Sequence, residues 1–140
     1  MSTRSAIGYE LPSGRIKAVY CHNDGEPKHQ LPDLTKHYDS IEKAKALVKP
    51  GSMSSLRTRH TWTCGPLLKL VGAYVRDEEG LLMYHDDREP QPLYYHERGE
   101  DDPPQINASI KAAEKLWRSR DCEHMYIYLI GHGWEHYDLQ

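Results

Sequence analysis

The stretch YCHNDGEP, residues 20–27, gathers a thiol, an imidazole, an amide and two carboxylates around one glycine. A catalytic cysteine–histidine pair needs its sulfur and imidazole within hydrogen-bond reach. Neighbours on an extended strand point to opposite faces, so Cys21 and His22 are not expected to pair. His22 and Asp24 share a side, and such a pair could orient a base or bind a metal. We favour the interpretation that Asn-Asp-Gly closes a turn, with a recognition surface second and reactive chemistry third.

The other groups of chemistry-bearing residues form weaker patterns. His132 and His136 stand four apart in HGWEH, but the two glycines there indicate a turn, whereas HxxxH binds metal on a helix. We therefore expect no metal site and no cofactor. SMSSLRTRH, residues 52–60, could hold a phosphate, although a loop before an edge strand is the simpler interpretation. The sequence contains neither a phosphate-binding glycine loop nor a serine-nucleophile motif.

The length of 140 residues fits a single domain, residues 1–140. No run of 18 apolar residues is present, which predicts no membrane span. The opening lacks the apolar core of a signal peptide, and three scattered cysteines suit a reducing interior. We therefore expect a protein of the cytoplasm that contacts no membrane. The sequence leaves the oligomeric state open.

Charge is divided along the chain. Residues 1–70 carry 11 Lys and Arg against 6 Asp and Glu, whereas residues 71–102 carry 3 against 10. A dipolar surface that steers a charged partner would show this division, but so would acids in solvated loops, which their clustering at turns favours. The net charge of −3 disfavours duplex DNA as the principal partner. Ten Tyr and three Trp, with no Phe, suit half-buried sheet faces and interfaces.

The elements that position these residues follow from periodicity. Alternation in 5–11 and 15–21, with Pro-Ser-Gly between them, predicts a β-hairpin. The stretch YCHNDGEP then connects its second strand to helical sequence. Asp39, with Glu42 three residues later, matches a capping box and predicts a helix that ends at a Pro-Gly pair. A shorter helical turn around 33–38 fits the pattern as well.

The second half is predicted as further strands and one helix. Four strand candidates lie at 57–63, 68–75, 81–85 and 92–97, the middle two as a hairpin around an acidic loop. An apolar stripe from Ile106 to Trp117 predicts a helix after two prolines. Residues 124–130 and 134–139 are predicted as a terminal hairpin around Gly-His-Gly. The expected fold is α+β, a mainly antiparallel sheet with two principal helices packed on one face.

Five segments occur together in an order shared with a known family. They are the opening MSTRSAI, the stretch YCHNDGEP, a His-Tyr before a charged helix, YYHERGED, and a closing hairpin that ends near Gly-His-Gly-Trp. Together they resemble a family of small proteins of tailed phages and related mobile elements. The resemblance spans most of the chain apart from roughly residues 56–92, and it implies origin more than mechanism.

The resemblance implies that the residues shared within the family occur at thirteen positions of this chain. They are Tyr20, Cys21, His22, Asp24, Gly25, Pro27, Tyr95, His96, Arg98, Gly99, Glu100, Gly133 and Trp134. One position departs from the family, which usually has Trp between the His and the Asp where this chain has Asn23. If that Trp forms a stacking or partner-binding surface, this chain has altered the surface.

Two functional hypotheses follow. The first is a non-enzymatic, phage-encoded accessory protein of the host cytoplasm that binds a host protein or complex and inhibits or redirects it, as an anti-CRISPR-like inhibitor of a defence system would. Its candidate partner-binding residues are Tyr20, His22, Asn23, Asp24, Tyr95, His96, Arg98, Glu100 and Trp134. The alternative is a small-ligand- or nucleotide-binding protein or hydrolase, in which His22 and Asp24 converge with His96, Arg98 and Glu100. Direct nucleic-acid binding ranks last.

Overall fold

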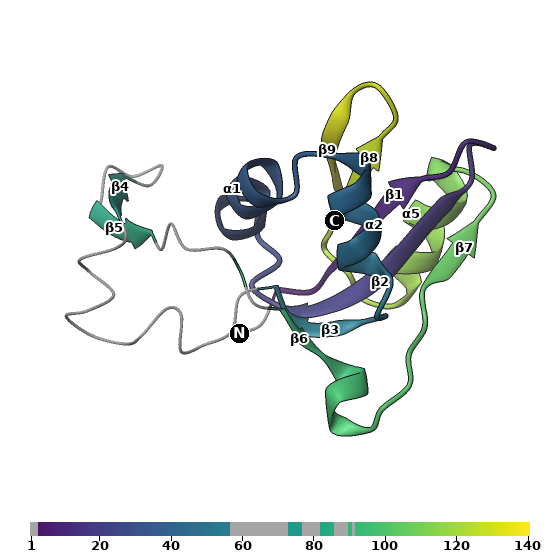
Figure 1. The fold of residues 1–140 in the computed structure, drawn as a ribbon, viewed down its shortest axis with the longest axis horizontal. Helices are drawn as coiled ribbons and strands as arrows, with labels where there is room; N and C mark the ends of the chain where they lie inside the picture. Colours follow the sequence, from purple (N-terminus) through teal and green to yellow (C-terminus); the bar gives the residue numbers. More distant parts are fainter. Residues whose placement is uncertain (1–2, 57–72, 77–81, 86–89, 91) are drawn as a thin grey trace.

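A computed structural model describes residues 3–56, 73–76, 82–85, 90 and 92–140, and Figure 1 shows their arrangement. Within this part of the chain, one mixed sheet has the strand order β6-β3-β2-β1-β8-β9, with β7 paired to β2. Its strands are β1 Ser5–Glu10, β2 Ile16–Asn23, β3 Met53–Ser55, β6 Leu93–Tyr94, β7 Gln105–Asn107, β8 His124–Leu129 and β9 Gly133–Asp138. The helices are α1 Pro27–His37, α2 Ile41–Val48, the 3-10 helix η1 Tyr95–Arg98 and α5 Ile110–Ser119. A separate hairpin pairs β4 Ala73–Arg76 with β5 Leu82–His85.

The N-terminal hairpin forms the centre of the sheet. β1 and β2 are antiparallel, with Ser5 opposite Cys21 and Glu10 opposite Ile16. The turn between them closes where the amide of Gly14 donates to the carbonyl of Leu11 at 2.8 Å. Gly14 has a φ of +87°, which a residue without a Cβ adopts readily. The predicted hairpin is therefore confirmed. β1 also pairs in parallel with β8, which makes β1 and β2 inner strands.

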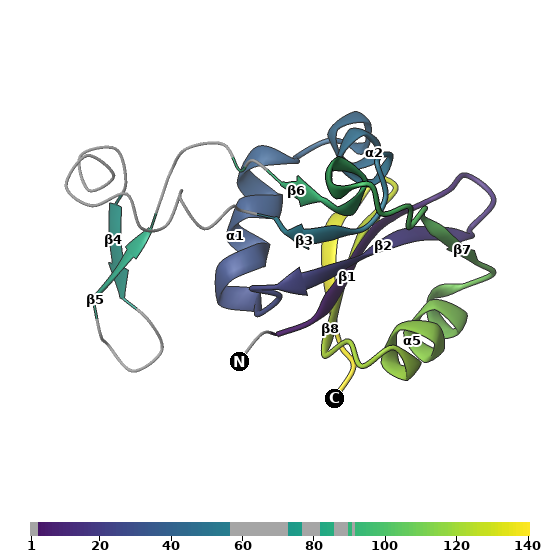
Figure 2. The same cartoon turned by 90° about the horizontal axis from the view of Figure 1, so that it is seen from below.

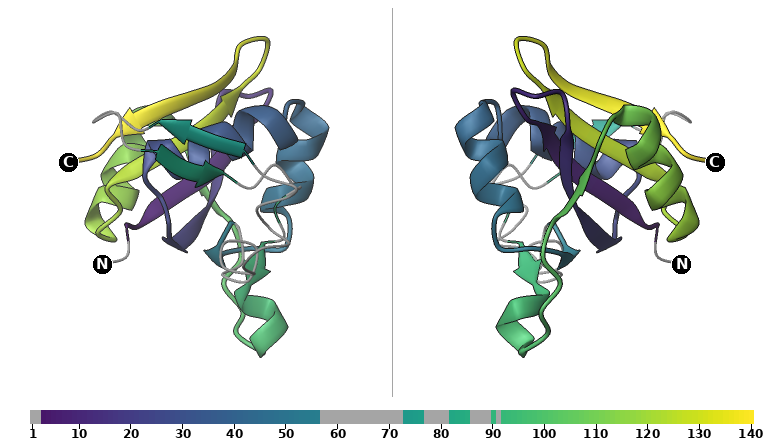
Figure 3. Two further views of the ribbon diagram at one scale, coloured as in Figure 1. Left: turned by 90° about the vertical axis from the view of Figure 1, so that its left-hand side faces the viewer. Right: turned by 90° about the vertical axis from the view of Figure 1, so that its right-hand side faces the viewer.

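Helices cover both faces of the sheet, as Figures 2 and 3 show. On one face, Leu34 of α1 and Leu47 of α2 pack with Ile7, Val19 and other strand residues. On the other face, Trp117 of α5 packs with strand residues of the opposite parity, among them Ala6, Ala18 and Met125. The α+β class with a mainly antiparallel sheet is confirmed. The helices predicted at 39–49 and before Trp117 do not share a face, because α1 takes the place beside α2 and α5 packs against the other side.

The two helices on the first face begin and end differently from the sequence pattern. The N-cap of α2 is Ser40, whose hydroxyl accepts from the amide of Lys43 at 3.3 Å, and not Asp39. Asp39 instead pairs with the Lys43 ammonium at 3.0 Å. α1 is a full eleven-residue helix where only a turn at 33–38 fitted the pattern. Pro27 opens α1 at a position where a missing N–H costs nothing, which explains why helix follows YCHNDGEP at once.

The second half departs most from the prediction. β7 is a short strand where a helix was predicted, and β3 is a short strand where a loop was predicted. The strand predicted at 92–97 ends at Tyr94, after which the chain forms the 3-10 helix η1. The helix predicted from Ile106 begins at Ile110, where the Ser109 hydroxyl accepts from the Ala112 amide at 3.2 Å. The hairpin of β4 with β5 and that of β8 with β9 are confirmed. The strand predicted at 57–63 lies outside the described residues. None of the described helices is both long enough and apolar enough to span a membrane.

Candidate partner-binding surface around Tyr20 and His22

The stretch YCHNDGEP is anchored to the sheet through its glycine. The Gly25 amide donates to the Thr3 carbonyl at 2.9 Å, and the Gly25 carbonyl accepts from the Tyr126 hydroxyl at 2.6 Å. A Cβ at Gly25 would stand 2.7 Å from the Cβ of Ser5. Asp24 before it has a φ of +59°, a left-handed conformation that Asp tolerates better than most residues. Residues 24–26 are therefore a short connection from β2 to α1 that is fixed against β1 and β8.

The thiol of this stretch belongs to the core. Cys21 is fully buried, its sulfur accepts from Nε2 of Gln30 at 3.1 Å, and Oε1 of Gln30 accepts from the Ser5 hydroxyl at 2.9 Å. Burial raises the pKa of the Cys21 thiol to about 12. A nucleophilic cysteine needs the opposite shift, toward thiolate. Cys21 therefore serves here to link α1 to the first two strands.

We expect Cys21 to resist alkylation in the native protein. A rise of the thiol pKa from 9.0 to about 12 leaves roughly a thousandfold less thiolate at pH 8 than in the unfolded chain. Burial excludes the reagent as well. Timed iodoacetamide labelling followed by peptide mass spectrometry, with and without guanidinium, measures this protection. Native labelling of Cys21 at the unfolded rate would contradict the packing around Gln30.

Tyr20 and His22 lie on the opposite face of β2 from Cys21. The Tyr20 hydroxyl and Nδ1 of His22 are 2.7 Å apart, and both side chains are partly exposed. Burial raises the pKa of Tyr20 to about 12, and the nearby Arg4 guanidinium opposes that rise while Tyr95 adds to it. We define the Tyr20 surface as Arg4, Tyr20, His22 and Tyr95. It lies beside the part of the sheet that α5 covers, since Tyr20 packs against the cluster around Trp117 of α5.

Ser52 joins this surface to η1. Its hydroxyl accepts from the Tyr20 amide at 3.0 Å, and its carbonyl accepts from the Tyr95 amide at 3.1 Å. The Glu100 amide donates to the Tyr95 carbonyl at 3.1 Å, which fixes the end of η1. The segments 20–22 and 95–100 are therefore neighbours in the fold, although more than seventy positions separate them in the sequence. Arg4 was not predicted as a site residue, and Ser52 was named only as part of the stretch 52–60 that could hold a phosphate, for which a loop was the simpler interpretation.

The remaining predicted residues lie around this surface or away from it. His96 is exposed and stacks on Tyr94, with ring centroids 5.6 Å apart. Asn23 ends β2 and reaches the Ser54 hydroxyl at 3.5 Å. Asp24 and Glu100 are exposed, and the side chain of Arg98 lies outside the described residues. Trp134 is elsewhere, on β9, where its Nε1 donates to the Tyr38 carbonyl at 2.7 Å.

The arrangement presents one polar aromatic pair beside a cation. The short contact between Tyr20 and His22 satisfies both groups, so His22 is oriented by a phenol on its own strand, whereas the sequence suggested Asp24 in that role. A partly exposed Tyr offers apolar area together with a polar group, which suits a protein interface. Arg4 is itself held by Asp121, 3.6 Å away. Such a surface can bind an aromatic or acidic group of a partner.

Histidines form a second pair on the outer hairpin. Nδ1 of His124 and Nε2 of His136 are 2.9 Å apart, and the His136 ring stacks on Tyr126 at 5.2 Å between centroids. His132 instead pairs with Glu135 at 2.9 Å, so the HGWEH histidines do not converge. Among the described residues, no three His, Cys, Asp or Glu side chains are grouped as a metal ion requires.

We expect the His124–His136 pair to make the protein less stable in mild acid. Burial and the neighbouring His124 lower the pKa of His136, and Asp138 and Glu135 only partly oppose this. Because the unfolded chain then binds this proton more readily, the free energy of unfolding falls as pH drops below about 6.5. Urea unfolding at pH 7.5 and 5.5 measures the drop. His136→Gln should reduce it, whereas His96→Gln controls for the loss of any imidazole; equal drops in all three proteins would contradict the pairing.

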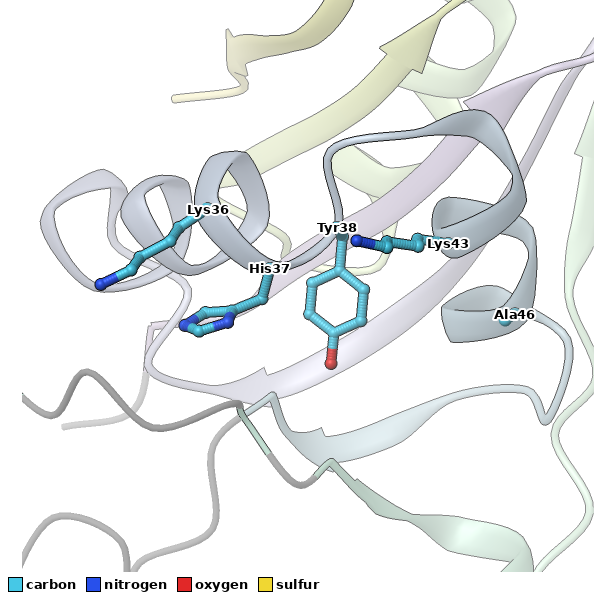
Figure 4. Close-up of a pocket in the computed structure, with 5 residues that line it drawn as sticks. All are labelled: Lys36, His37, Tyr38, Lys43 and Ala46. Carbon is cyan, nitrogen blue, oxygen red and sulfur yellow. The ribbon is translucent and has the colours of Figure 1, made fainter.

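A hollow of about 300 Å³ lies between the end of α1 and α2. It is lined by Lys36, His37, Tyr38, Lys43 and Ala46, and Figure 4 shows the two rings side by side between the lysines. Lysine and histidine at a helix C-terminus stabilise the helix itself, and Lys43 is paired with Asp39. The hollow is therefore explained by the ends of the two helices and shares no residue with the Tyr20 surface.

The described residues define an α+β protein with a mixed sheet, on which the Tyr20–His22 pair is partly exposed. Searches among protein-family models, curated proteins and solved structures found no match to the chain. Its function therefore has to be argued from its own residues.

Proposed function

We propose that this protein is a non-enzymatic binding protein, and that the Tyr20 surface is where it contacts a partner. The observation that carries the proposal is the partly exposed Tyr20–His22 pair beside Arg4 and Tyr95. Tyr and Arg are the residue types enriched at protein interfaces and among their energetically dominant contacts. The buried, hydrogen-bonded Cys21 supports the same reading, because it assigns the thiol of the shared stretch to folding.

The resemblance to small phage proteins gives the proposal its biological direction. A protein of that origin would act in the cytoplasm of the bacterial host on a host protein or complex, and inhibition of an antiviral defence system is the role we propose. The chain departs from the family at Asn23, next to His22. That position lies at the edge of the Tyr20 surface, so we propose that partner choice differs from that of relatives with Trp there.

Site-specific crosslinking tests the proposal. A photoreactive benzoylphenylalanine replaces Tyr20 in one variant and the exposed Lys45 of α2, on the other side of the sheet, in the control. Illumination in a candidate host should give a discrete crosslinked product from the Tyr20 position only. The captured partner, purified, should then bind Tyr20→Ala about tenfold more weakly than the unaltered protein, as expected for loss of one dominant contact. Products from both positions, or equal affinities, would reject the surface.

The small-ligand alternative stays a prediction with its own measurement. It needs His22 and Asp24 to act with His96, Arg98 and Glu100 on one ligand. A nucleotide that binds the folded state raises the melting temperature by mass action. A shift with millimolar ATP or GTP that His22→Ala removes would favour this alternative over a protein partner.

A further inference from the structure

The outer edge of the sheet is formed by β9. In the described part of the chain this strand pairs with β8 on one side and with no strand on the other, and Figure 3 shows it along the outside of the sheet. β9 is six residues long and contains no proline. The opposite side of the sheet ends in much shorter strands, β6 with two residues and β7 with three. β9 therefore offers the longest free row of backbone groups on the described sheet.

The register of the hairpin shows which groups are free. Just beyond the ladder, the Leu139 amide donates to the Glu123 carbonyl at 2.9 Å. The pairs of β8 with β9 continue from there without a shift, from His124 opposite Asp138 to Leu129 opposite Gly133. In an antiparallel ladder, hydrogen-bonded pairs alternate with pairs whose groups point outward. The amides and carbonyls of Trp134, His136 and Asp138 therefore face the free edge.

Side-chain packing holds this edge in an extended conformation. Trp134 donates to the Tyr38 carbonyl and meets the Tyr128 ring edge-on at 5.5 Å between centroids. His136 is fixed by His124 and Tyr126. Next to the strand, in the turn, Ile130 is 52% exposed and adds an apolar contact point. A strand that is already ordered loses little conformational entropy when another strand pairs with it.

The charge along this edge is negative. Glu135 and Asp138 lie on β9, which carries no lysine or arginine. Glu135 already contacts Nε2 of His132 at 2.9 Å, and Asp138 accepts from the Gln140 amide at 3.0 Å, so a cationic partner would add to or replace these contacts. The carboxylates of Glu135, Glu114 and Glu10 all lie close enough to Tyr137 to raise the pKa of its phenol, in addition to the effect of burial. Arg118 of α5 donates from Nε to the Leu139 carbonyl at 2.9 Å. A partner segment with positive charge is the complement to such an edge.

The same charges argue against a second copy of this chain as the occupant. An antiparallel pair of two β9 strands would place two acidic edges side by side, with Glu135 opposite Glu135 in one register and Asp138 opposite Asp138 in another. Like charges on paired strands are destabilising. Charged side chains on an edge are also a common way to keep identical strands from pairing.

We propose that the free edge of β9 is a docking site for an extended, lysine- or arginine-rich segment of another protein, which adds to the sheet as a further strand. Backbone hydrogen bonds to Trp134, His136 and Asp138 supply the register. Glu135 and Asp138 select for positive charge, and this combination is the usual logic of strand addition. The site is separate from the Tyr20 surface, so either one can be correct without the other.

A synthetic peptide of alternating valine and lysine tests the docking site by hydrogen exchange in the full-length protein. Without peptide, the amides of Trp134, His136 and Asp138 should exchange rapidly, and those of Glu135 and Tyr137 slowly. Saturating peptide should slow the first set at least tenfold, since each amide gains a partner. A peptide of alternating valine and glutamate should change nothing. No protection by the lysine peptide, or protection elsewhere on the sheet, would overturn the proposal.

Charge variants separate the side-chain contribution from the backbone one. The double change Glu135→Gln and Asp138→Asn keeps both shapes and should weaken binding of the lysine peptide roughly three- to tenfold, as expected for two exposed ion pairs. The matched control is Glu42→Gln with Asp101→Asn, which removes the same charges from exposed positions elsewhere. Equal weakening in both would overturn the assignment to β9. Protection of the same amides that grows with protein concentration alone would show that a second copy docks there.

Discussion

Gly51→Ala is expected to lower the free energy of unfolding by roughly 2–4 kcal/mol, because the site resists a Cβ in two ways. Gly51 has a φ of +101°, which residues with a side chain rarely adopt. A Cβ built there would also stand 2.5 Å from the carbonyl oxygen of Asp102, a backbone atom that cannot rotate away. That carbonyl accepts from the Ser52 amide at 2.9 Å. The clash therefore disturbs the residue that joins β2 to η1.

Gly14→Ala is the matched control for this prediction. Gly14 also has a positive φ, +87°, but nothing lies within 4 Å of its Cβ position. Only the conformational term applies, so we expect a loss of about 1 kcal/mol. Urea unfolding followed by circular dichroism measures both variants. If the two lose equal stability, the close approach at Asp102 has no energetic weight.

The parts of the fold that could be predicted are those with local signals. The hairpin of β1 and β2 has alternation on both sides of a glycine turn, and β8 with β9 has the same pattern around Gly-His-Gly. β3 could not be predicted in this way, because Met53–Ser55 is short and two of its three residues are serines. It becomes a strand because β2 and β6 supply partners on both sides. Tertiary pairing, with no local signal, decides such elements.

The face of the sheet on which a helix packs could likewise not be predicted from the sequence. The stripe ending at Trp117 shows that α5 has an apolar side, but it does not show which side of the sheet receives that stripe. The answer depends on the path of the chain through β7, which pairs with β2 and delivers α5 to the second face. Ile106 was read as part of the stripe, whereas it lies on β7 and is 50% exposed. A single apolar residue is compatible with the periodicity of a helix and with that of a strand.

The candidate site was predicted in part for the same reason. Strand alternation correctly separated Cys21 from His22, but the contact of His22 with Tyr20 was not predicted. The alternation wrongly continued to Asp24, because the backbone leaves the extended conformation there at a φ of +59°. The contribution of Arg4 was not predicted, since Arg4 precedes β1 and is held by a residue far away in the sequence. Asp121, which holds Arg4, arrives from the far end of α5.

Trp117→Ala is expected to lower the free energy of unfolding by roughly 3–5 kcal/mol, the range for large aromatic side chains in a core. Trp117 is fully buried between α5 and the sheet. Its carbonyl also accepts from the Cys122 amide at 3.0 Å, and the next amide, that of Glu123, donates to the Arg4 carbonyl at 2.9 Å. The cavity therefore opens beside the segment that holds one side of the Tyr20 surface.

Trp117→Phe separates the cavity from the chemistry of the indole. Nε1 of Trp117 is buried and has no hydrogen-bond partner among the described residues, and such an unsatisfied donor costs about 1–3 kcal/mol. Phe removes that donor together with part of the ring, so the two effects oppose each other and we expect a net loss below about 1.5 kcal/mol. Chemical unfolding of both variants measures the difference. A loss with Phe as large as that with Ala would mean that the Nε1 donor is satisfied in solution, and that the ring's polar edge is part of what fixes α5 to the sheet.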